Sequence, residues 1–243
     1  MLLSLMDDLR KSRTAGIAAF TLIELLTVIA VIGVLTAILI PAIGATQQSA
    51  QKAKCASNLR QIGQAISLFA MNNNGYFPLS THTVRNVDES WIYTIAPYLG
   101  EVDEVRICPA DPQGPERLEL NLTSYVLNEF VVVPNMDPFG QMRTNSYTNL
   151  WRLQNPALTM VAFIASDSMP LGDHSDHTHS RGWGNWNRVI ADIQPNRFGS
   201  ESSDGLGGSS NFLFADGHVD TIEAEALQQK ILSGNNPADP VNL

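Results

Sequence analysis

The order of apolar and polar residues divides the chain into three parts. Residues 20–43 are almost continuously apolar, with Glu24 as the one charged side chain among 24 positions. About 20 apolar residues suffice for a helix to cross a hydrocarbon core of about 30 Å, so this run predicts a transmembrane helix. A cleavable secretory signal has an apolar stretch of only about 7–15 residues, so this run is a poor match to one.

Beyond the membrane the helix is expected to continue as an amphipathic helix. Between residues 45 and 72, apolar side chains recur at intervals of three and four positions, which places them on one helical face. The asparagines at 72–74, Gly75 and Pro78 then predict the helix end, because Asn and Gly favour the left-handed conformation of a cap. The apolar face comprises Cys55, Leu59, Ile62, Ile66 and Phe69, whereas Lys52, Lys54, Arg60 and Gln61 are polar.

The remaining residues, 75–243, predict a globular head with a mainly antiparallel sheet. We expect β-type runs at 124–133, 159–165 and 211–222, and a short helix at 90–99. Asp216 and Gly217 separate two β-prone stretches, and such a pair is a strong short-range signal for a hairpin. The expected fold class is α+β, with a long N-terminal helix whose second half packs against the sheet.

The net charge of the chain limits the classes of partner that we expect. The chain carries a net charge of −9 with a pI near 4.9 and no basic stripe, whereas nucleic-acid binding needs clustered Lys and Arg. We therefore expect no nucleic-acid partner. Arg10, Lys11 and Arg13 precede the apolar run, and the preference for Lys and Arg on the cytoplasmic side places the N-terminus inside. Residues after about 44 are then extracytoplasmic, in a single-pass membrane protein.

Glu24 interrupts the apolar run near its start. A carboxylate at the centre of a span costs about 2.5–3.5 kcal/mol, and less near an end. Two interpretations stay open: the side chain reaches the headgroup region and is solvated there, or a partner neutralises it in an assembly. Near the other end of the run, Pro41 removes a helix hydrogen bond and marks a bend.

The string AFTLIELLTVIAVIGVLTAILIPAI at residues 19–43 closely resembles the cleavage and methylation signature of type IV prepilins and type II secretion pseudopilins. The resemblance implies a leader at 1–19, cleavage by a prepilin peptidase between Ala19 and Phe20, and N-methylation of Phe20. Ala19 stands where these precursors usually have Gly. We interpret it as a small substitute, because a cut after Gly16 would move Glu24 from the fifth to the eighth mature position.

This resemblance implies a pilin-like fold and a filament subunit as the function. Its partners would be the peptidase, other pilin or pseudopilin subunits and an inner-membrane assembly platform. The chain would sit in the bacterial inner membrane with its head in the periplasm, and then enter a pilus or pseudopilus. Residues 20–43 would form the transmembrane half of the helix, 44–74 the amphipathic half and 75–243 the head. Glu24 would neutralise the Phe20 amine of a neighbouring subunit, and Pro41 also falls at its family position.

Residues 55–78 and the string ICPADP at 107–112 further resemble a large pseudopilin-like group of planctomycete and verrucomicrobial type. That group has a C-terminal DG hairpin with a His ten positions before the Asp. Here Leu206 occupies that position.

Cys55 and Cys108 are the two cysteines, too few for a disulfide scaffold and without the CxxC spacing of a metal site. One bridge or two free thiols are the alternatives. In an oxidising compartment a bridge would join a loop to the helix and contribute about 2–4 kcal/mol. We favour the bridge.

The densest group of candidate metal ligands lies in the loop at 172–180. Imidazoles and carboxylates of this kind hold transition metals, but the spacing matches neither HExxH nor an EF-hand. A solvated loop is the favoured interpretation, and no metal ligand is assigned. Calcium binding stays an open alternative, although the sequence contains no recognisable calcium-ligand motif. No cofactor is expected. The loop contains Asp173, His174, Asp176, His177 and His179, and the carboxylates considered for calcium are Asp167, Asp173, Asp216 and Asp220.

The sequence gives no case for catalysis, since it contains no GxSxG, P-loop or dinucleotide fingerprint. Trp183 and Trp186 are interpreted as buried anchors rather than as a shelf for a sugar. The leading hypothesis is a filament subunit. The alternative is a membrane-anchored module that binds a carbohydrate or a metal and does not polymerise.

Overall fold

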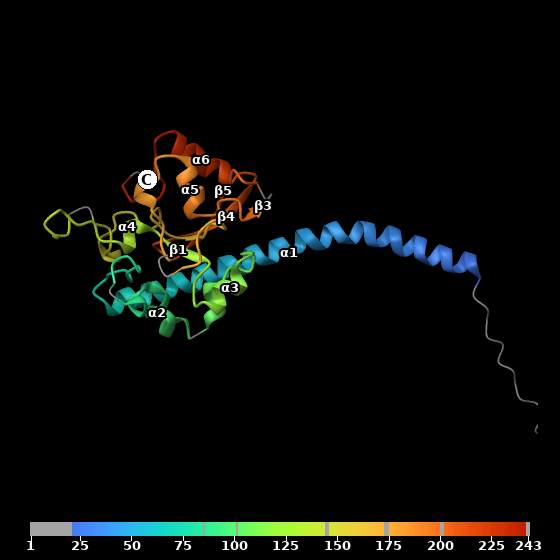
Figure 1. Ribbon diagram of the computed structural model, residues 1–243, viewed down its shortest axis with the longest axis horizontal. Coiled ribbons are helices and arrows are strands. Elements are labelled where there is room, and N and C mark those ends of the chain that lie inside the picture. Colours follow the sequence, from blue (N-terminus) through green and yellow to red (C-terminus); the bar gives the residue numbers. More distant parts are fainter. Residues whose placement is uncertain are drawn as a thin grey trace, which may run out of the picture. The chain divides into compact units, whose positions relative to one another are not determined.

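The computed structural model of the protein describes residues 21–84, 86–100, 102–143, 146–172, 175–199 and 202–241 (Figure 1). The side chain of Pro41 also lies outside this description. The chain forms two compact units that divide between Thr46 and Gln47.

The first unit contains the beginning of helix α1, which runs from Leu22 to Asn72. From Thr21 to Thr46 every side chain that the structure describes is exposed, although most are Leu, Ile, Val or Ala. The helix is long and apolar enough to cross a membrane. A helix that is apolar on all sides is stable only when lipid or other protein surrounds it.

The second unit is built on an antiparallel sheet. In the described residues the strands are β1 (Tyr125–Leu127), β2 (Met160–Ile164), β3 (Phe198–Gly199), β4 (Gly208–Phe214) and β5 (Val219–Glu223). Strand β4 is central, because it pairs with β2, β3 and β5, while β1 extends the sheet beyond β2.

The later part of α1 covers one face of this sheet. Cys55, Leu59 and Ile62 are fully buried in a cluster that also holds Leu127 and Leu213 of the strands. The predicted apolar stripe is therefore confirmed, and so is the α+β fold with a long helix packed on a mainly antiparallel sheet.

The opposite face of the sheet is covered as well, which the sequence did not predict. Val126 points into a second cluster with Trp183 and Trp186, at the helices α5 (Trp186–Asp192) and α6 (Ala224–Leu232). These two helices lie side by side in Figure 1 and are in contact. Both tryptophans are buried, which confirms their interpretation as core anchors.

Helix α1 ends where the sequence predicts. Asn74 and Gly75 have φ angles of 54° and 83°, in the left-handed region. The Gly75 amide donates to the carbonyl of Ala70 at 2.8 Å, which satisfies a carbonyl of the last turn. The hairpin is confirmed in the same way, since Gly217 has a φ of 90° between β4 and β5.

The expected strand at 124–133 is wrong in its second half. Pairing stops at Leu127, and helix α4 (Glu129–Val132) follows. The Asn128 side chain accepts a hydrogen bond from the Phe130 amide at 3.1 Å, so an Asn cap turns the chain into a helix before its β-branched residues can pair.

The expected helix at 90–99 is present as two short pieces, α2 (Trp91–Thr94) and η3 (Ala96–Leu99). The other short helical segments are η2 (Val87–Glu89), η4 (Asp103–Arg106), α3 (Gly114–Glu119), η5 (Leu150–Arg152) and η6 (Ser180–Gly182).

Candidate functional site

The first predicted site lies at the start of α1. Ala19 and Phe20 are outside the described residues. Glu24 stands in the first helical turn, and its Oε2 accepts the Thr21 amide at 2.9 Å and the Thr21 hydroxyl at 2.7 Å. In return the Glu24 amide donates to Thr21 Oγ1 at 3.2 Å. This reciprocal pattern is a capping box, which satisfies two amides that the helix itself leaves unpaired.

Sequence reasoning missed this local role of Glu24. The signal was present, since Thr followed three residues later by Glu before an apolar run is the usual mark of a capping box. The carboxylate therefore has a partner within its own chain. It also lies where the positive end of the helix dipole favours an anion.

Pro41 does not interrupt α1. The backbone is helical on both sides of it, from Leu22 through Asn72.

Cys55 and Cys108 meet in the core as two thiols. Both are buried, and the two side chains are close enough to affect each other's pKa. The Tyr125 hydroxyl donates to Cys55 Sγ at 3.5 Å. The neighbouring Cys55 side chain and burial raise the pKa of the Cys108 thiol, because both oppose formation of a thiolate. The two side chains predicted to form a bridge are thus neighbours, and the bridge itself stays a prediction.

The loop at 172–180 contributes to a histidine cluster. Asp173 and His174 lie outside the described residues. His177 and His179 come together with His82, so that one ligand nitrogen from each lies within 4.8 Å of the others. Among the described residues, this is the one group in which three or more His, Cys, Asp or Glu side chains bring their ligand atoms this close together. His82 is 95 positions from His177 and has no local motif, so sequence reasoning could not find it.

The carboxylates considered for calcium are engaged separately. Asp167 pairs with Arg197 Nη2 at 2.6 Å. Asp216 lies in the hairpin turn and accepts the His218 amide at 3.1 Å. Asp220 is exposed on β5. Over the described ranges, none of them joins a cluster of three ligand groups.

A polar cleft of about 1070 Å³ lies in the second unit, with Gln48, Asp111, Asp167 and Arg197 among its lining residues. Its acidic side chains have cationic partners, since Asp111 lies 3.0 Å from a guanidinium nitrogen of Arg117 and Asp167 pairs with Arg197. Among its described lining residues, the acidic side chains are therefore paired with cations and form no acid–base pair that points to a reaction.

Comparison with known proteins relates the chain to a secretion protein. Type II secretion system core protein G of Escherichia coli (strain K12) is 24% identical over 134 residues, which are 55% of this chain and 90% of that protein. The chain is a distant relative of that secretion protein. No family model matches the sequence. No solved structure matches it significantly. The distant relationship agrees with the pseudopilin-like N-terminal segment.

Proposed function

We propose that this protein is a pilin-like filament subunit, processed by prepilin peptidase and assembled through α1 into a pseudopilus or pilus. The observation that carries the proposal is the division of α1. Its described side chains up to Thr46 are exposed and mostly apolar, whereas Cys55, Leu59 and Ile62 are buried in the head. One helix thus carries an apolar surface that no described residue covers, and its later part contributes buried side chains to the core of the head.

The same apolar surface would allow the subunit to reside in a membrane first and to pack into a filament afterwards. In the bacterial inner membrane, lipid would surround residues 22–43, with the N-terminus cytoplasmic and the head periplasmic. In the filament, the same segments of neighbouring subunits would replace the lipid. The relationship to a core protein of a type II secretion system supports this use, with an assembly platform and other subunits as partners.

Glu24 is proposed to register the subunits. After cleavage at Ala19, the new Phe20 amine would be a cation in an apolar environment, which is costly unless a carboxylate neutralises it. The capping box with Thr21 involves Oε2 of Glu24. Because a carboxylate has about four acceptor sites, Glu24 can also accept a hydrogen bond from the amine of a neighbouring subunit.

The test has two readouts in a host that expresses prepilin peptidase and a type II assembly apparatus. Intact mass and N-terminal sequencing of the membrane-extracted protein should give a chain that begins at Phe20 and carries one added methyl group. Shearing should release the wild-type protein in filaments. Glu24→Ala should stay in the membrane fraction at wild-type abundance and be absent from the sheared fraction.

The anchored module predicts the opposite pattern. A subunit that never appears in sheared filaments, with wild type and Glu24→Ala equally abundant in membranes, would reject filament assembly and favour the module. A chain that keeps Met1 despite active peptidase would reject processing at Ala19.

A further inference from the structure

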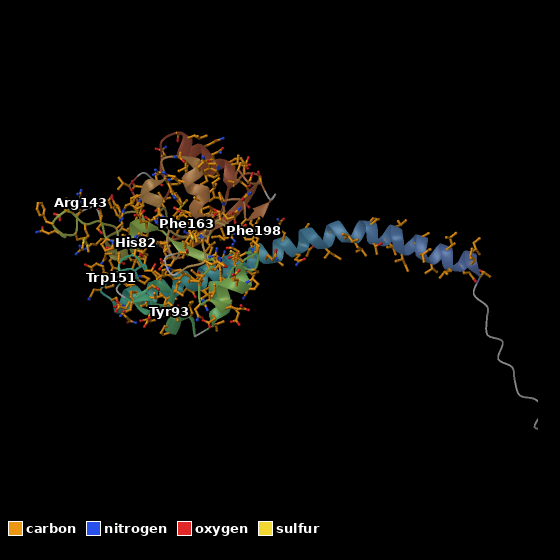
Figure 2. All side chains as sticks on the ribbon, viewed as in Figure 1. His82, Tyr93, Arg143, Trp151, Phe163 and Phe198 are labelled. Carbon is orange, nitrogen blue, oxygen red and sulfur yellow. The ribbon has the colours of Figure 1, made fainter. Side chains whose placement is uncertain are left out.

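Three imidazoles from distant parts of the chain meet in the second unit. His82 lies between α1 and η2, and Figure 2 labels it; His177 and His179 precede η6. His82 Nδ1 is 2.9 Å from His177 Nε2, and one ligand nitrogen from each of the three rings lies within 4.8 Å of the others. His177 is buried, whereas His82 and His179 are exposed, so the cluster is open to solvent.

A buried carboxylate fixes the ring of His177. Asp176 Oδ1 lies 2.7 Å from His177 Nδ1, which leaves Nε2 directed at the cluster. Asp176 also accepts the Thr81 amide and the Thr81 hydroxyl, each at 2.9 Å. One carboxylate thus orients His177 and holds the residue just before His82. Histidines that bind metals almost always have such a second partner on the other ring nitrogen.

A second carboxylate holds His179. Asp192 Oδ2 accepts the His179 amide at 2.7 Å and the Trp183 indole at 2.8 Å, and its Oδ1 lies 3.4 Å from His179 Nδ1. The backbone of His179 is therefore anchored although its side chain is 66% exposed. Pairing through Nδ1 leaves Nε2 as the nitrogen available for a ligand bond.

The chemistry of the three ligand atoms indicates which metal ion the cluster would bind. Three imidazole nitrogens without thiolates suit Zn²⁺ and Cu²⁺, whereas Ca²⁺ and Mg²⁺ prefer oxygen ligands. A tetrahedral Zn²⁺ with bonds of about 2.0–2.1 Å separates two ligand nitrogens by about 3.3 Å. The observed 2.9 Å between His82 and His177 needs only a small side-chain movement, and His82 is exposed and can make it. The fourth position would take water.

We propose that His82, His177 and His179 bind a zinc-class divalent ion that ties the segment after α1 to the segment before η6. The ligands come from positions 95 residues apart, so the ion would stabilise the folded head. The alternative arrangement is an N–H···N hydrogen bond between His82 and His177 with no affinity for metal. The proposal is independent of filament assembly.

The test uses the full chain in detergent, stripped with a chelator and then titrated with Zn²⁺ against a chromogenic competitor at neutral pH. Wild type should bind one ion per chain, and Zn²⁺ should raise its thermal unfolding midpoint. His82→Ala and His179→Ala, both at exposed positions, should weaken binding by more than roughly tenfold, since even outer partners of metal ligands contribute about 10–100-fold. Both variants should also lose the Zn²⁺-dependent thermal shift.

His218→Ala is the matched control, because His218 also pairs with an aspartate, Asp216, but lies outside the cluster. It should bind Zn²⁺ as wild type does. Co²⁺ should give a visible spectrum of low-coordinate nitrogen ligation with wild type and not with His82→Ala, and Ca²⁺ should give no thermal shift through this cluster. Equal Zn²⁺ affinity in wild type and His82→Ala, or equal loss in His218→Ala, would overturn the proposal.

Discussion

Thr21 and Glu24 close the first turn of α1 on each other, with the Thr21 hydroxyl 2.7 Å from Glu24 Oε2 and the Glu24 amide 3.2 Å from Thr21 Oγ1. A residue whose position suggested a role between subunits therefore also has a role within its own helix. The two roles depend on different properties of the side chain. Capping needs a hydrogen-bond acceptor, whereas neutralising an amine needs a negative charge.

Glu24→Gln separates these roles. Gln serves at this position of a capping box, so the helix start should be retained while the charge is lost. If Glu24 neutralises the Phe20 amine, Glu24→Gln should be as absent from sheared filaments as Glu24→Ala. Thr21→Ala should cost about 0.5–2 kcal/mol of helix stability and still assemble. The measurement is the ratio of sheared to membrane-bound protein. Normal assembly of Glu24→Gln with failure of Thr21→Ala would assign Glu24 to capping alone.

Cys55 and Cys108 should be oxidised to one bridge in protein exported to an oxidising compartment, because the two thiols are neighbours in the folded core. Intact mass without reductant should be lower by two hydrogen atoms. Reduction should then lower the free energy of unfolding by about 2–4 kcal/mol. Cys108→Ala is the control, and its stability should not respond to reductant. Two thiols that label fully after denaturation without reductant would contradict the bridge.

The phenol of Tyr125 should make stability depend on alkaline pH. Burial, followed by the neighbouring Cys55 thiol, raises the pKa of Tyr125 well above its usual value. Below about pH 10 the phenol is protonated in both states, so its contribution is constant. Above that pH the unfolded chain loses the proton and the folded chain keeps it. The free energy of unfolding should then fall by up to about 1.4 kcal/mol per pH unit for this group.

The comparison that isolates this effect is Tyr125→Phe against Tyr93→Phe. Denaturant unfolding of reduced protein between pH 9 and 11 should show a shallower decline for Tyr125→Phe than for wild type. Tyr93 is 37% exposed, so Tyr93→Phe should follow the wild-type curve. Identical slopes in wild type and Tyr125→Phe would show that the buried phenol does not contribute.

What the sequence predicted well rests on local signals. The end of α1 depends on Asn74 and Gly75, and the hairpin depends on Gly217; each acts through its own backbone conformation. The error after Leu127 arose because β-branched residues at 131–133 favour a strand, while the Asn128 cap decides for a helix. Propensity is a weak signal beside a specific side-chain hydrogen bond.

The histidine cluster shows why other features of the fold and the site could not be predicted from the sequence. His177 and His179 are close in sequence, but the third ring belongs to His82, which the fold brings in through Asp176 and Thr81. Only the tertiary structure makes that contact, and no spacing rule encodes it. The second helical layer over the sheet was missed for the same reason.

Gly63 should resist replacement by Ala. A Cβ there would lie 2.7 Å from Cδ1 of Leu213, a fully buried side chain of β4. Ala is preferred over Gly inside a helix by about 1 kcal/mol, but overpacking a core costs about 1–3 kcal/mol. We expect a net loss of about 1 kcal/mol in denaturant unfolding. Gly44→Ala, where the added Cβ meets nothing within 4 Å, should show no loss. A stabilised Gly63→Ala variant would mean that Leu213 relaxes freely.

The ion pair between Arg117 and Asp111 should be costly to break from one side. Arg117 Nε lies 3.0 Å from Asp111 Oδ2, and each side chain is 1% exposed. Ser124 donates its hydroxyl to the same Oδ2 at 2.6 Å, which holds the carboxylate in the core. Arg117→Ala leaves that carboxylate buried without its cation, and such a loss typically destabilises a protein by about 3–5 kcal/mol.

The double variant decides whether the cost comes from the unpaired charge. Each single variant leaves one buried charge without its partner, whereas Arg117→Ala combined with Asp111→Ala leaves none. The double variant should therefore lose less stability in denaturant unfolding than the two single variants added together. Arg60→Ala, at an exposed position on α1, should change stability by no more than about 0.5 kcal/mol. Strict additivity of Arg117→Ala and Asp111→Ala would mean that the two side chains stabilise the head through separate packing contacts rather than through their mutual attraction.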